Sequence, residues 1–426
     1  MTTKINNEHN KLNFSSEREQ SQACLNSAEH EKNQGRKVLN VPNLRFPGFQ
    51  GEWEEERLAD IADLYKGTGI SKDQLSDDGE PCILYGELYT KYKSETIREV
   101  LSKTNIDNTK LVRSKANDVI IPCSGETAED IATARCVLNG NILLGGDLNI
   151  IRLHGYDGAF MSYQLNGRRK YDIAKVAQGV SVVHLYGEHL KGVKTINPCL
   201  EEQKKIAKLL SLLDERITTQ NKIIEDLKKL KSAIIEIEYT PNTKTTSHIG
   251  NVIEQISKRN KNNAIQNVLS VSNRQGFIKQ SDQFENRNVA SEDTSNYKIV
   301  EHNDFAFNPA RINVGSIARL TTFEKGIVSP MYICFRTQEN VAPEYIDYFF
   351  ESKHFYCEIQ KRLEGSVRQC LSFEGLCNIP LSLPSFEMQQ LIGKRLFTLG
   401  QKIKTETDLL ELLNKQKQYL LRQMFI

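Results

Sequence analysis

Apolar residues recur at alternating spacings of three and four along two long stretches, Cys199 to Tyr239 and Ser385 to Phe425. This spacing keeps one apolar stripe on a single helix face and predicts a long amphipathic helix in each stretch. The first stripe consists of Ile206, Leu210, Leu213, Ile217, Gln220, Ile224 and Leu227. The second stripe consists of Ile392, Leu396, Leu399, Ile403, Glu406, Leu410 and Leu413. Each of these residues lies 186 positions after its counterpart, so the stripe repeats without a gap.

The polar interruptions of the two stripes also repeat. Gln220 corresponds to Glu406, and Lys231 corresponds to Lys417. A polar residue in an apolar stripe lowers stability while it fixes the register of two packed helices. Matching interruptions therefore predict that the two helices pack against each other, as an antiparallel coiled coil with pseudo-two-fold symmetry.

The offset of 186 residues extends outside the helices. Asn117-Asp118 recurs as Asn303-Asp304, Gly179 recurs as Gly365, and Pro198 recurs as Pro384. Such an internal repeat divides the chain more reliably than its length does. It predicts a polar tail (1–40), a first mixed α/β domain (41–198), a central helix (199–240), a second mixed α/β domain (241–383) and a C-terminal helix (384–426). The predicted fold class is α+β.

Local patterns within the first domain predict its main elements. Three short apolar runs bounded by turn residues predict strands at Cys82 to Leu88, Asp118 to Pro122 and Asn141 to Leu153. The segment Gly158 to Val176 has helical character. Together these elements predict a domain that combines strands with helices.

Composition narrows the class of protein. With 39% hydrophobic and 26% charged residues, the 426-residue chain has the composition of a soluble globular protein. No apolar run approaches the roughly 18 residues that span a membrane, and the polar start lacks a signal-peptide core, so we expect a cytoplasmic protein without membrane contact. The tail before residue 40 is too polar to bury a core, which predicts disorder. The net charge of +2 does not by itself indicate a nucleic-acid partner.

A search for reaction chemistry gives no candidate. The nine cysteines contain no CxxC pair, which argues against a zinc ribbon, and their odd number argues against a closed disulfide framework. His184, Glu188 and His189 could suggest a metal site, but the repeat replaces both histidines, which favours a structural role. Asn308-Pro309 lacks the proline and aromatic that an amino-methyltransferase motif needs next. We therefore expect no catalytic residue and no metal in this chain.

Two segments resemble a known family. Asn43 to Phe49, followed by Trp53 and Leu58, resembles the N-terminal opening of specificity subunits of Type I restriction-modification systems. The segment Gly179 to Gln203 resembles the junction between a target-recognition domain and its spacer helix in that family. The resemblance covers residues 41–426. The chain departs from the family pattern in its longer tail and in Met388, which replaces Glu202 of the first copy.

The resemblance implies a function as a non-catalytic specificity subunit. The two target-recognition domains would each read one half of a split target in double-stranded DNA, with the helices as a spacer that also docks two modification (methyltransferase) subunits. Restriction (translocase) subunits would join the complex. No cofactor is expected in this chain, whereas S-adenosylmethionine, ATP and Mg would be used on other subunits. Because the loops Gly179 to His184 and Gly365 to Cys370 differ, the expected target is asymmetric.

Residue type and loop position indicate the candidate DNA contacts. Side chains with hydrogen-bond donors and acceptors on loops are the usual readers of bases. In the second domain the candidate readers are Arg274, Gln275, Arg311, Asn313, Arg368 and Gln369. In the first domain the offset and the loop character select Tyr89, Lys91, Ser124, Ser181 and His184. Candidate phosphate contacts are Lys66, Lys72, Lys258, Arg259 and Lys261. Each has a plain alternative as a solvated surface residue.

Two other functions stay open at this level. The chain could be an assembly scaffold that binds protein partners through its domains without DNA readout, or, more distantly, an enzyme such as a lone nuclease. Salt dependence separates the first two hypotheses, because a protein that contacts phosphates loses affinity steeply between about 50 and 200 mM salt.

Overall fold

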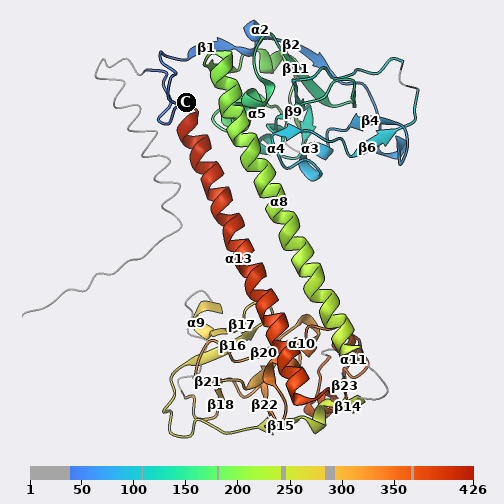
Figure 1. Cartoon of the computed structure of the whole chain (residues 1–426), viewed down its shortest axis with the longest axis vertical. Helices are drawn as coiled ribbons and strands as arrows, with labels where there is room; N and C mark the ends of the chain where they lie inside the picture. The colour runs from blue at the N-terminus through green and yellow to red at the C-terminus, as the bar shows by residue number, and fades with distance from the viewer. Residues whose placement is uncertain (1–38, 108, 180–181, 241–245, 284–292, 366–368) are drawn as a thin grey trace, which may run out of the picture. The chain divides into compact units, whose positions relative to one another are not determined.

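The computed structural model describes residues 39–107, 109–179, 182–240, 246–283, 293–365 and 369–426. The chain divides into two compact units, Met1–Glu215 with Asn414–Ile426, and Arg216–Leu413. Each unit contains a mixed α/β domain and part of both long helices (Figure 1). The predicted class of two mixed domains, each followed by a long helix, is confirmed. The predicted domain bounds follow sequence elements and stay a prediction.

The first unit is built on two main sheets. A five-stranded sheet has the order β2 (Ala62–Lys66), β11 (Leu148–Leu153), β7 (Asp118–Pro122), β9 (Arg135–Val137) and β5 (Thr96–Ile97). A four-stranded sheet has the order β10 (Leu143–Leu144), β4 (Glu80–Ile83), β6 (Ser102–Thr104) and β3 (Leu75–Ser76). Two further pairs are β1 (Glu54–Arg57) with β13 (Lys194–Asn197), and β8 (Ser124–Gly125) with β12 (Val183–His184).

Short helices complete the first unit. These are α2 (Leu58–Ile61), η2 (Lys72–Gln74), α3 (Glu87–Thr90), α4 (Ala128–Ile131), α5 (Gly158–Asn166), α6 (Lys170–Val176) and α7 (Gly187–Lys191). The central strand β7 is buried on both faces because its side chains alternate between two cores. Val119 and Ile121 pack in the core that contains α5, whereas Ile120 packs in the core shared with the four-stranded sheet.

Three sequence predictions for this domain need correction. The predicted strand from Asn141 to Leu153 is divided into β10 and β11, which belong to different sheets. The run Cys82 to Leu88 is only partly strand, because β4 ends at Ile83 and the chain turns into α3. The buried Glu87 carboxylate accepts the Leu84 N–H at 3.0 Å and so stabilises this turn. The predicted helix over Gly158 to Val176 is interrupted after Asn166, where Gly167 has φ −94° and ψ −106°.

The second unit contains two four-stranded sheets. One has the order β15 (Ile253–Ile256), β22 (Ile333–Thr337), β19 (Phe305–Phe307) and β20 (Ile317–Arg319). The other has the order β17 (Gly276–Lys279), β16 (Val268–Ser272), β21 (Lys325–Val328) and β18 (Lys298–Glu301). A further pair joins β14 (Thr246–His248) to β23 (Pro380–Ser382). The helices are η3 (Ile249–Asn251), α9 (Gln280–Gln283), η4 (Ile312–Val314), α10 (Pro343–Phe349), α11 (Lys353–Gln360) and α12 (Phe373–Cys377).

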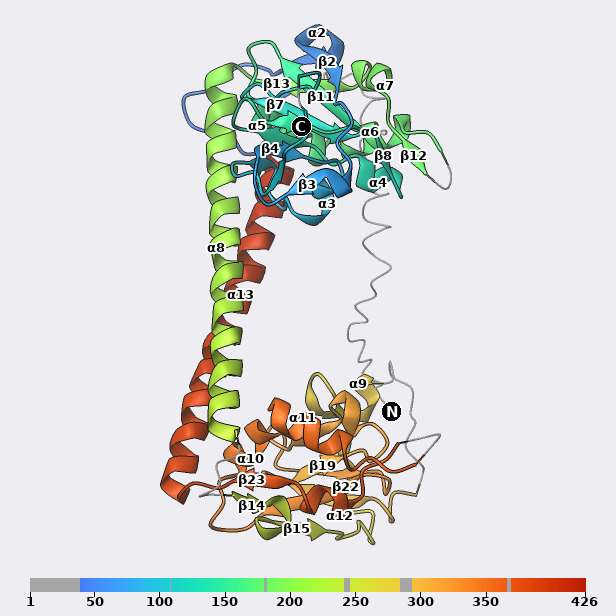
Figure 2. The same ribbon diagram turned by 90° about the vertical axis from the view of Figure 1, so that its right-hand side faces the viewer.

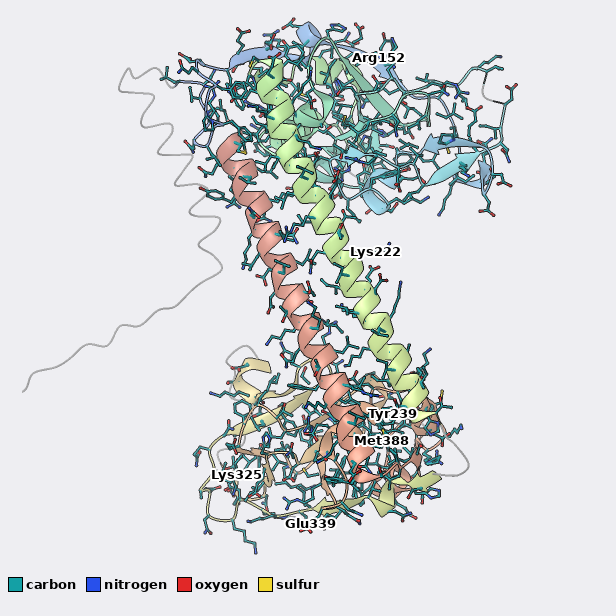
Figure 3. All side chains as sticks on the ribbon, viewed as in Figure 1. Arg152, Lys222, Tyr239, Lys325, Glu339 and Met388 are labelled. Carbon is teal, nitrogen blue, oxygen red and sulfur yellow. The ribbon has the colours of Figure 1, made fainter. Side chains whose placement is uncertain are left out.

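Backbone details of the internal repeat recur in both domains. Asn117 and Asn303 precede β7 and β19, and both adopt positive φ angles, of 78° and 71°. Asparagine is one of the few residues that tolerates this conformation. The next residues, Asp118 and Asp304, are buried and accept two hydrogen bonds each from an arginine, which is Arg152 for Asp118 (Figure 3). The repeat thus preserves a turn and a buried aspartate paired with a partly exposed arginine, as well as a pattern of apolar residues.

The predicted long helices are confirmed almost to the residue as α8 (Leu200–Tyr239) and α13 (Phe386–Met424). With 40 residues at 1.5 Å each, α8 is about 60 Å long. In the first unit, Ile206 and Leu210 of α8 share a core with Met424 at the end of α13. In the second unit, the end of α8 shares a core with the start of α13, through Tyr239 and Ile392. Within each unit the helices therefore pair antiparallel.

The apolar stripes differ in burial along their length. Buried members are Ile206, Leu210, Leu213, Gln220, Ile224, Ile392, Leu396 and Leu413, and half-buried members are Ile217, Leu227, Leu399, Ile403, Glu406 and Leu410. The Gln220 side-chain amide donates to the Glu406 carbonyl at 2.9 Å and to its carboxylate. These two interruptions therefore contact each other in the second unit. Regular coiled-coil packing stays a prediction.

The lysine interruptions have different contacts. Lys231 pairs with Glu351 of the second domain at 2.6 Å. Lys417 pairs with Glu95 of the first domain at 2.6 Å and with Asp214 of α8 at 2.7 Å. Each lysine therefore forms an ion pair between a long helix and a carboxylate of the domain that the helix packs against.

A glutamine explains the shared start of the two long helices. The Gln203 side chain donates to the Pro198 carbonyl at 2.8 Å and accepts the Asp157 N–H at 2.9 Å. Gln389 repeats both bonds, with the Pro384 carbonyl at 2.9 Å and the Ala342 N–H at 3.0 Å. In each copy, the glutamine thus connects the start of a long helix to the start of a short helix, which is α5 in the first copy and α10 in the second.

The N-terminal opening explains why Met388 replaces Glu202. Arg45 donates two hydrogen bonds of 2.8 Å to Glu202, whose side chain is fully buried. The opening occurs once, and Met388 is exposed (Figure 3). A carboxylate is needed only in the copy that faces an arginine.

No helix among the described residues combines the length and apolarity that a bilayer span requires.

Candidate nucleic-acid interface

Three candidate segments of the second domain converge on one loop. This loop, Pro309 to Gly315, contains η4 and carries Arg311 and Asn313. Its last residue, Gly315, has φ +88° and lies so close to the β16–β17 turn that a Cβ placed there would be 3.8 Å from the Asn273 Cβ. The loop also contacts the segment after Gln369, because the Leu371 N–H donates to the Pro309 carbonyl at 3.0 Å.

The side chains of this cluster are accessible. Arg274, Gln275, Arg311 and Gln369 are exposed, whereas Asn313 is half-buried. Within the described ranges, neither Arg274 nor Arg311 forms an ion pair. Guanidinium groups that are not already paired can donate to guanine O6 and N7 in a major groove. Arg368 lies outside the described residues.

The equivalent loops of the first domain are joined by the same backbone bonds. The Leu185 N–H donates to the Cys123 carbonyl at 2.8 Å, which repeats the bond from Leu371 to Pro309 at an offset of 186. Strand β12 pairs antiparallel with β8, which places His184 opposite Ser124. The Tyr89 hydroxyl donates to the Ser124 carbonyl at 3.4 Å. Three candidates thus lie together, whereas Ser181 is outside the described residues.

Lys91 is already engaged within the domain. Its ammonium lies 2.7 Å from the Glu87 carboxylate and donates to the Ser102 hydroxyl at 2.6 Å. Glu87 and Ser102 are buried, so Lys91 neutralises a carboxylate that burial would otherwise disfavour. A DNA contact by Lys91 stays a prediction.

A groove beside the β8–β12 pair contains residues that the sequence did not select. It has a volume of about 580 Å³, and its lining includes Tyr85, Tyr89, Glu126, Asp130 and Val182. Burial raises the pKa of the Tyr89 hydroxyl, so this group stays protonated and able to donate. Glu126 and Asp130 supply carboxylate acceptors, which can accept from cytosine N4. No local sequence pattern distinguishes Glu126 and Asp130, because only the fold brings them close to Ser124.

The predicted phosphate contacts fall into two groups. Lys66 at the end of β2 and Lys72 in η2 are exposed on the first domain. Lys258 and Arg259 line a concave surface of the second domain, about 750 Å³ in volume, which Lys261 also lines. Three neighbouring cations on a concave surface are the arrangement that attracts a phosphate backbone.

This concave basic surface and the loops that carry the candidate base contacts flank the same strand. Asn267, just before β16, donates to the carbonyl of Lys325 (Figure 3), which lines the concavity. The β16–β17 turn with Arg274 follows the other end of β16. Five strand residues span about 17 Å, comparable to a few base pairs of a duplex. The candidate base contacts and the candidate phosphate contacts of the second domain therefore lie at opposite ends of β16.

Comparisons with known proteins agree with these features. The family model described as the Type I restriction modification DNA specificity domain matches residues 50–229 and again 241–415. The chain is 25% identical over 409 residues to the Type I restriction enzyme MjaVIII specificity subunit of Methanocaldococcus jannaschii, covering 88% of this chain and 90% of that one. It is 24% identical over 438 residues to the putative type I restriction enzyme MjaX specificity subunit of the same organism, covering 90% and 93%.

A solved structure shares the fold. The S subunit of a Type I restriction-modification system from M. genitalium superposes with a TM-score of 0.58 at 17% identity. The alignment covers 91% of this chain and 99% of that chain. The two matches of the family model cover both halves of the internal repeat; the first ends within α8 and the second within α13.

Proposed function

The chain belongs to the family of Type I restriction-modification DNA specificity subunits, and we propose that its two domains each read one half of an asymmetric, bipartite DNA target. The convergence of the exposed residues Arg274, Gln275, Arg311 and Gln369 on one surface of the second domain supports this proposal most directly. The first domain carries the corresponding loops with different side chains. Different readers in equivalent loops favour two different half-sites.

We propose further that the long helices act as the spacer and dock two modification subunits, with restriction subunits joining the complex. The chain itself would carry no catalytic residue. S-adenosylmethionine, ATP and Mg would then be bound by the other subunits. The exposed apolar residues of the helices, among them Leu212, Leu230, Phe397 and Leu412, support a partner on their outer faces.

The proposal is tested by comparing Arg311→Ala with Lys258→Ala in the complex of this chain with its modification subunit. Arg311→Ala should relax selectivity at one base of one half-site, at about 1–3 kcal/mol for a lost bidentate contact. Lys258→Ala should weaken binding to all sequences alike and reduce the slope of log affinity against log salt by about one. Binding to DNA libraries between about 50 and 200 mM salt measures both effects.

The wild-type complex provides the decisive comparison for the scaffold alternative. If it binds no DNA library in a salt-sensitive manner, the DNA-reading function is wrong and a protein scaffold becomes the better explanation. Cleavage or methylation of DNA by the chain alone would instead support an enzyme.

A further inference from the structure

A groove in the first unit lies against the first turns of α8. It has a volume of about 810 Å³. Its apolar lining includes Phe46, Leu138, Leu209 and Leu212. Leu212 is 47% exposed, although leucine is usually buried. The groove is therefore an apolar surface that the chain itself leaves partly uncovered.

Cations line the same groove. Lys204, Lys205 and Lys208 of α8 and Arg98 after β5 are all lining residues. Lys204, Lys208 and Leu212 follow one another at intervals of four residues, which places them on one face of the helix. Within the described part of the chain, neither Lys204 nor Lys208 forms an ion pair, whereas Arg98 pairs with Glu215. The carboxylate of Asp157, which also lines the groove, accepts the Phe160 N–H as a helix cap.

The wall that contains Phe46 is held in place by the N-terminal opening. Arg45 is fixed to buried Glu202 by two hydrogen bonds, and it also donates to the Gly51 carbonyl at 2.6 Å. The Lys205 ammonium lies 5.0 Å from the centre of the Phe49 ring, within the range of a cation–π contact. The groove is thus formed before a partner binds, which reduces the entropy that binding costs.

The groove is separate from the candidate DNA-reading surface of the same unit. Figure 2 shows β8 and β12 on the side of the first unit away from α8. None of the candidate DNA contacts lines the groove. Its apolar floor also suits an apolar protein side chain better than a sugar-phosphate backbone. Burial of leucine and phenylalanine surface is favourable against another apolar surface, whereas a phosphate stays hydrated.

We propose that this groove binds an acidic segment of the modification subunit whose apolar side chains enter the groove. Carboxylates of that segment would pair with Lys204 and Lys208, and its apolar residues would cover Phe46 and Leu212. This inference rests on the proposed function, because that function supplies the modification subunit as the partner. It adds the location and chemistry of one docking surface.

The internal repeat supplies matched control positions. The residues 186 positions after Lys204, Lys208 and Leu212 are Gln390, Lys394 and Thr398. The second helix therefore presents one cation and no leucine where the first presents two cations and a leucine. We expect the two modification subunits to bind with unequal affinities.

The test uses the full chain with the modification subunit of the same system. The double variant Lys204→Glu with Lys208→Glu, and separately Leu212→Glu, should each weaken the binding of one modification subunit at least tenfold. Mass photometry should then show complexes with one modification subunit at concentrations where the wild type carries two. Lys394→Glu and Thr398→Glu are the matched controls. At the same concentration, more of the control complexes than of the groove-variant complexes should carry two modification subunits. All substituted side chains are exposed, and an unchanged unfolding midpoint confirms that each variant folds.

Two results would overturn the inference. One is unchanged affinity and stoichiometry for both groove variants. The other is loss of DNA affinity with full retention of modification subunits, which would make the groove a DNA contact. Target recognition by the wild-type complex is measured separately, so failure of the groove inference is distinguishable from failure of the proposed function.

Discussion

Lys417→Met is expected to lower the free energy of unfolding of the first unit by about 3–5 kcal/mol. The Lys417 ammonium lies 2.6 Å from Glu95 and 2.7 Å from Asp214, and all three side chains are at most 15% exposed. Asp214 also accepts a hydrogen bond of 2.7 Å from the buried Tyr163 hydroxyl. Removal of the ammonium leaves two buried carboxylates, with Arg135 as a neighbouring cation.

Trp53 provides the measurement, because it is the single tryptophan and is buried in the first unit. Urea unfolding followed by Trp53 fluorescence reports this unit specifically. The matched control is Lys231→Met, whose partner Glu351 is 48% exposed, so the expected loss is at most about 1 kcal/mol. Because Lys231 lies in the second unit, which Trp53 does not report, amide hydrogen exchange measures the loss of stability of each variant in its own unit. An unchanged urea midpoint for Lys417→Met would contradict a stabilising role for this cluster.

The effect of Lys417→Met should also depend on pH. Burial raises the pKa of Glu95, even though Lys417 opposes that rise. Loss of Lys417 should raise the pKa of Glu95 further. At pH values above the ordinary carboxyl pKa, the folded variant therefore binds more protons than the unfolded chain. Stability then falls as pH increases. We therefore expect the deficit of Lys417→Met to be larger at about pH 8 than at about pH 5.

Phe425→Ala should destabilise the first unit by about 3–5 kcal/mol, the usual range for a buried phenylalanine. Phe425 is 2% exposed, and its ring stacks on Phe160 with centroids 5.1 Å apart. Phe160 in turn packs edge to face on Trp53. A residue just after α13 thus completes the core of the first domain, far away in the sequence.

The control for Phe425→Ala is Tyr419→Ala, in the last turns of α13. Tyr419 is 59% exposed, so its truncation should change stability by no more than about 0.5 kcal/mol. Urea unfolding followed by Trp53 fluorescence applies to both variants. Equal midpoints for Phe425→Ala and Tyr419→Ala would show that the helix end is not part of this core.

The sequence predicts the long helices and the duplication because both depend on regular spacing. A stripe of period 3.5 persists over many turns, so local exceptions do not hide it. The same offset explains why equivalent loops could be selected in both domains, as the repeated bond from Leu185 or Leu371 to the preceding loop illustrates. Repetition carries information about tertiary structure that a single segment lacks.

Contacts between distant segments do not follow from the spacing of apolar residues. Lys231 and Lys417 interrupt the stripes as expected, but their carboxylate partners are fixed only by the fold. Glu126 lines the groove beside Ser124 because β8 and α4 meet there, which no periodicity indicates. The strand predicted through Leu88 ends early because the Glu87 side chain stabilises a turn. In each case the position or the polar contact of a side chain depends on the tertiary structure, which the pattern of apolar residues does not specify.

The most direct test of two-domain reading is a map of methylated adenines in cells that carry the complete system, with the wild-type chain or with Arg311→Ala. We predict one asymmetric wild-type target, with two specified segments separated by a gap of fixed length and unspecified sequence. Arg311→Ala should make one segment degenerate and leave the other unchanged. A contiguous wild-type target, or equal changes in both segments, would contradict the assignment of one half-site to each domain.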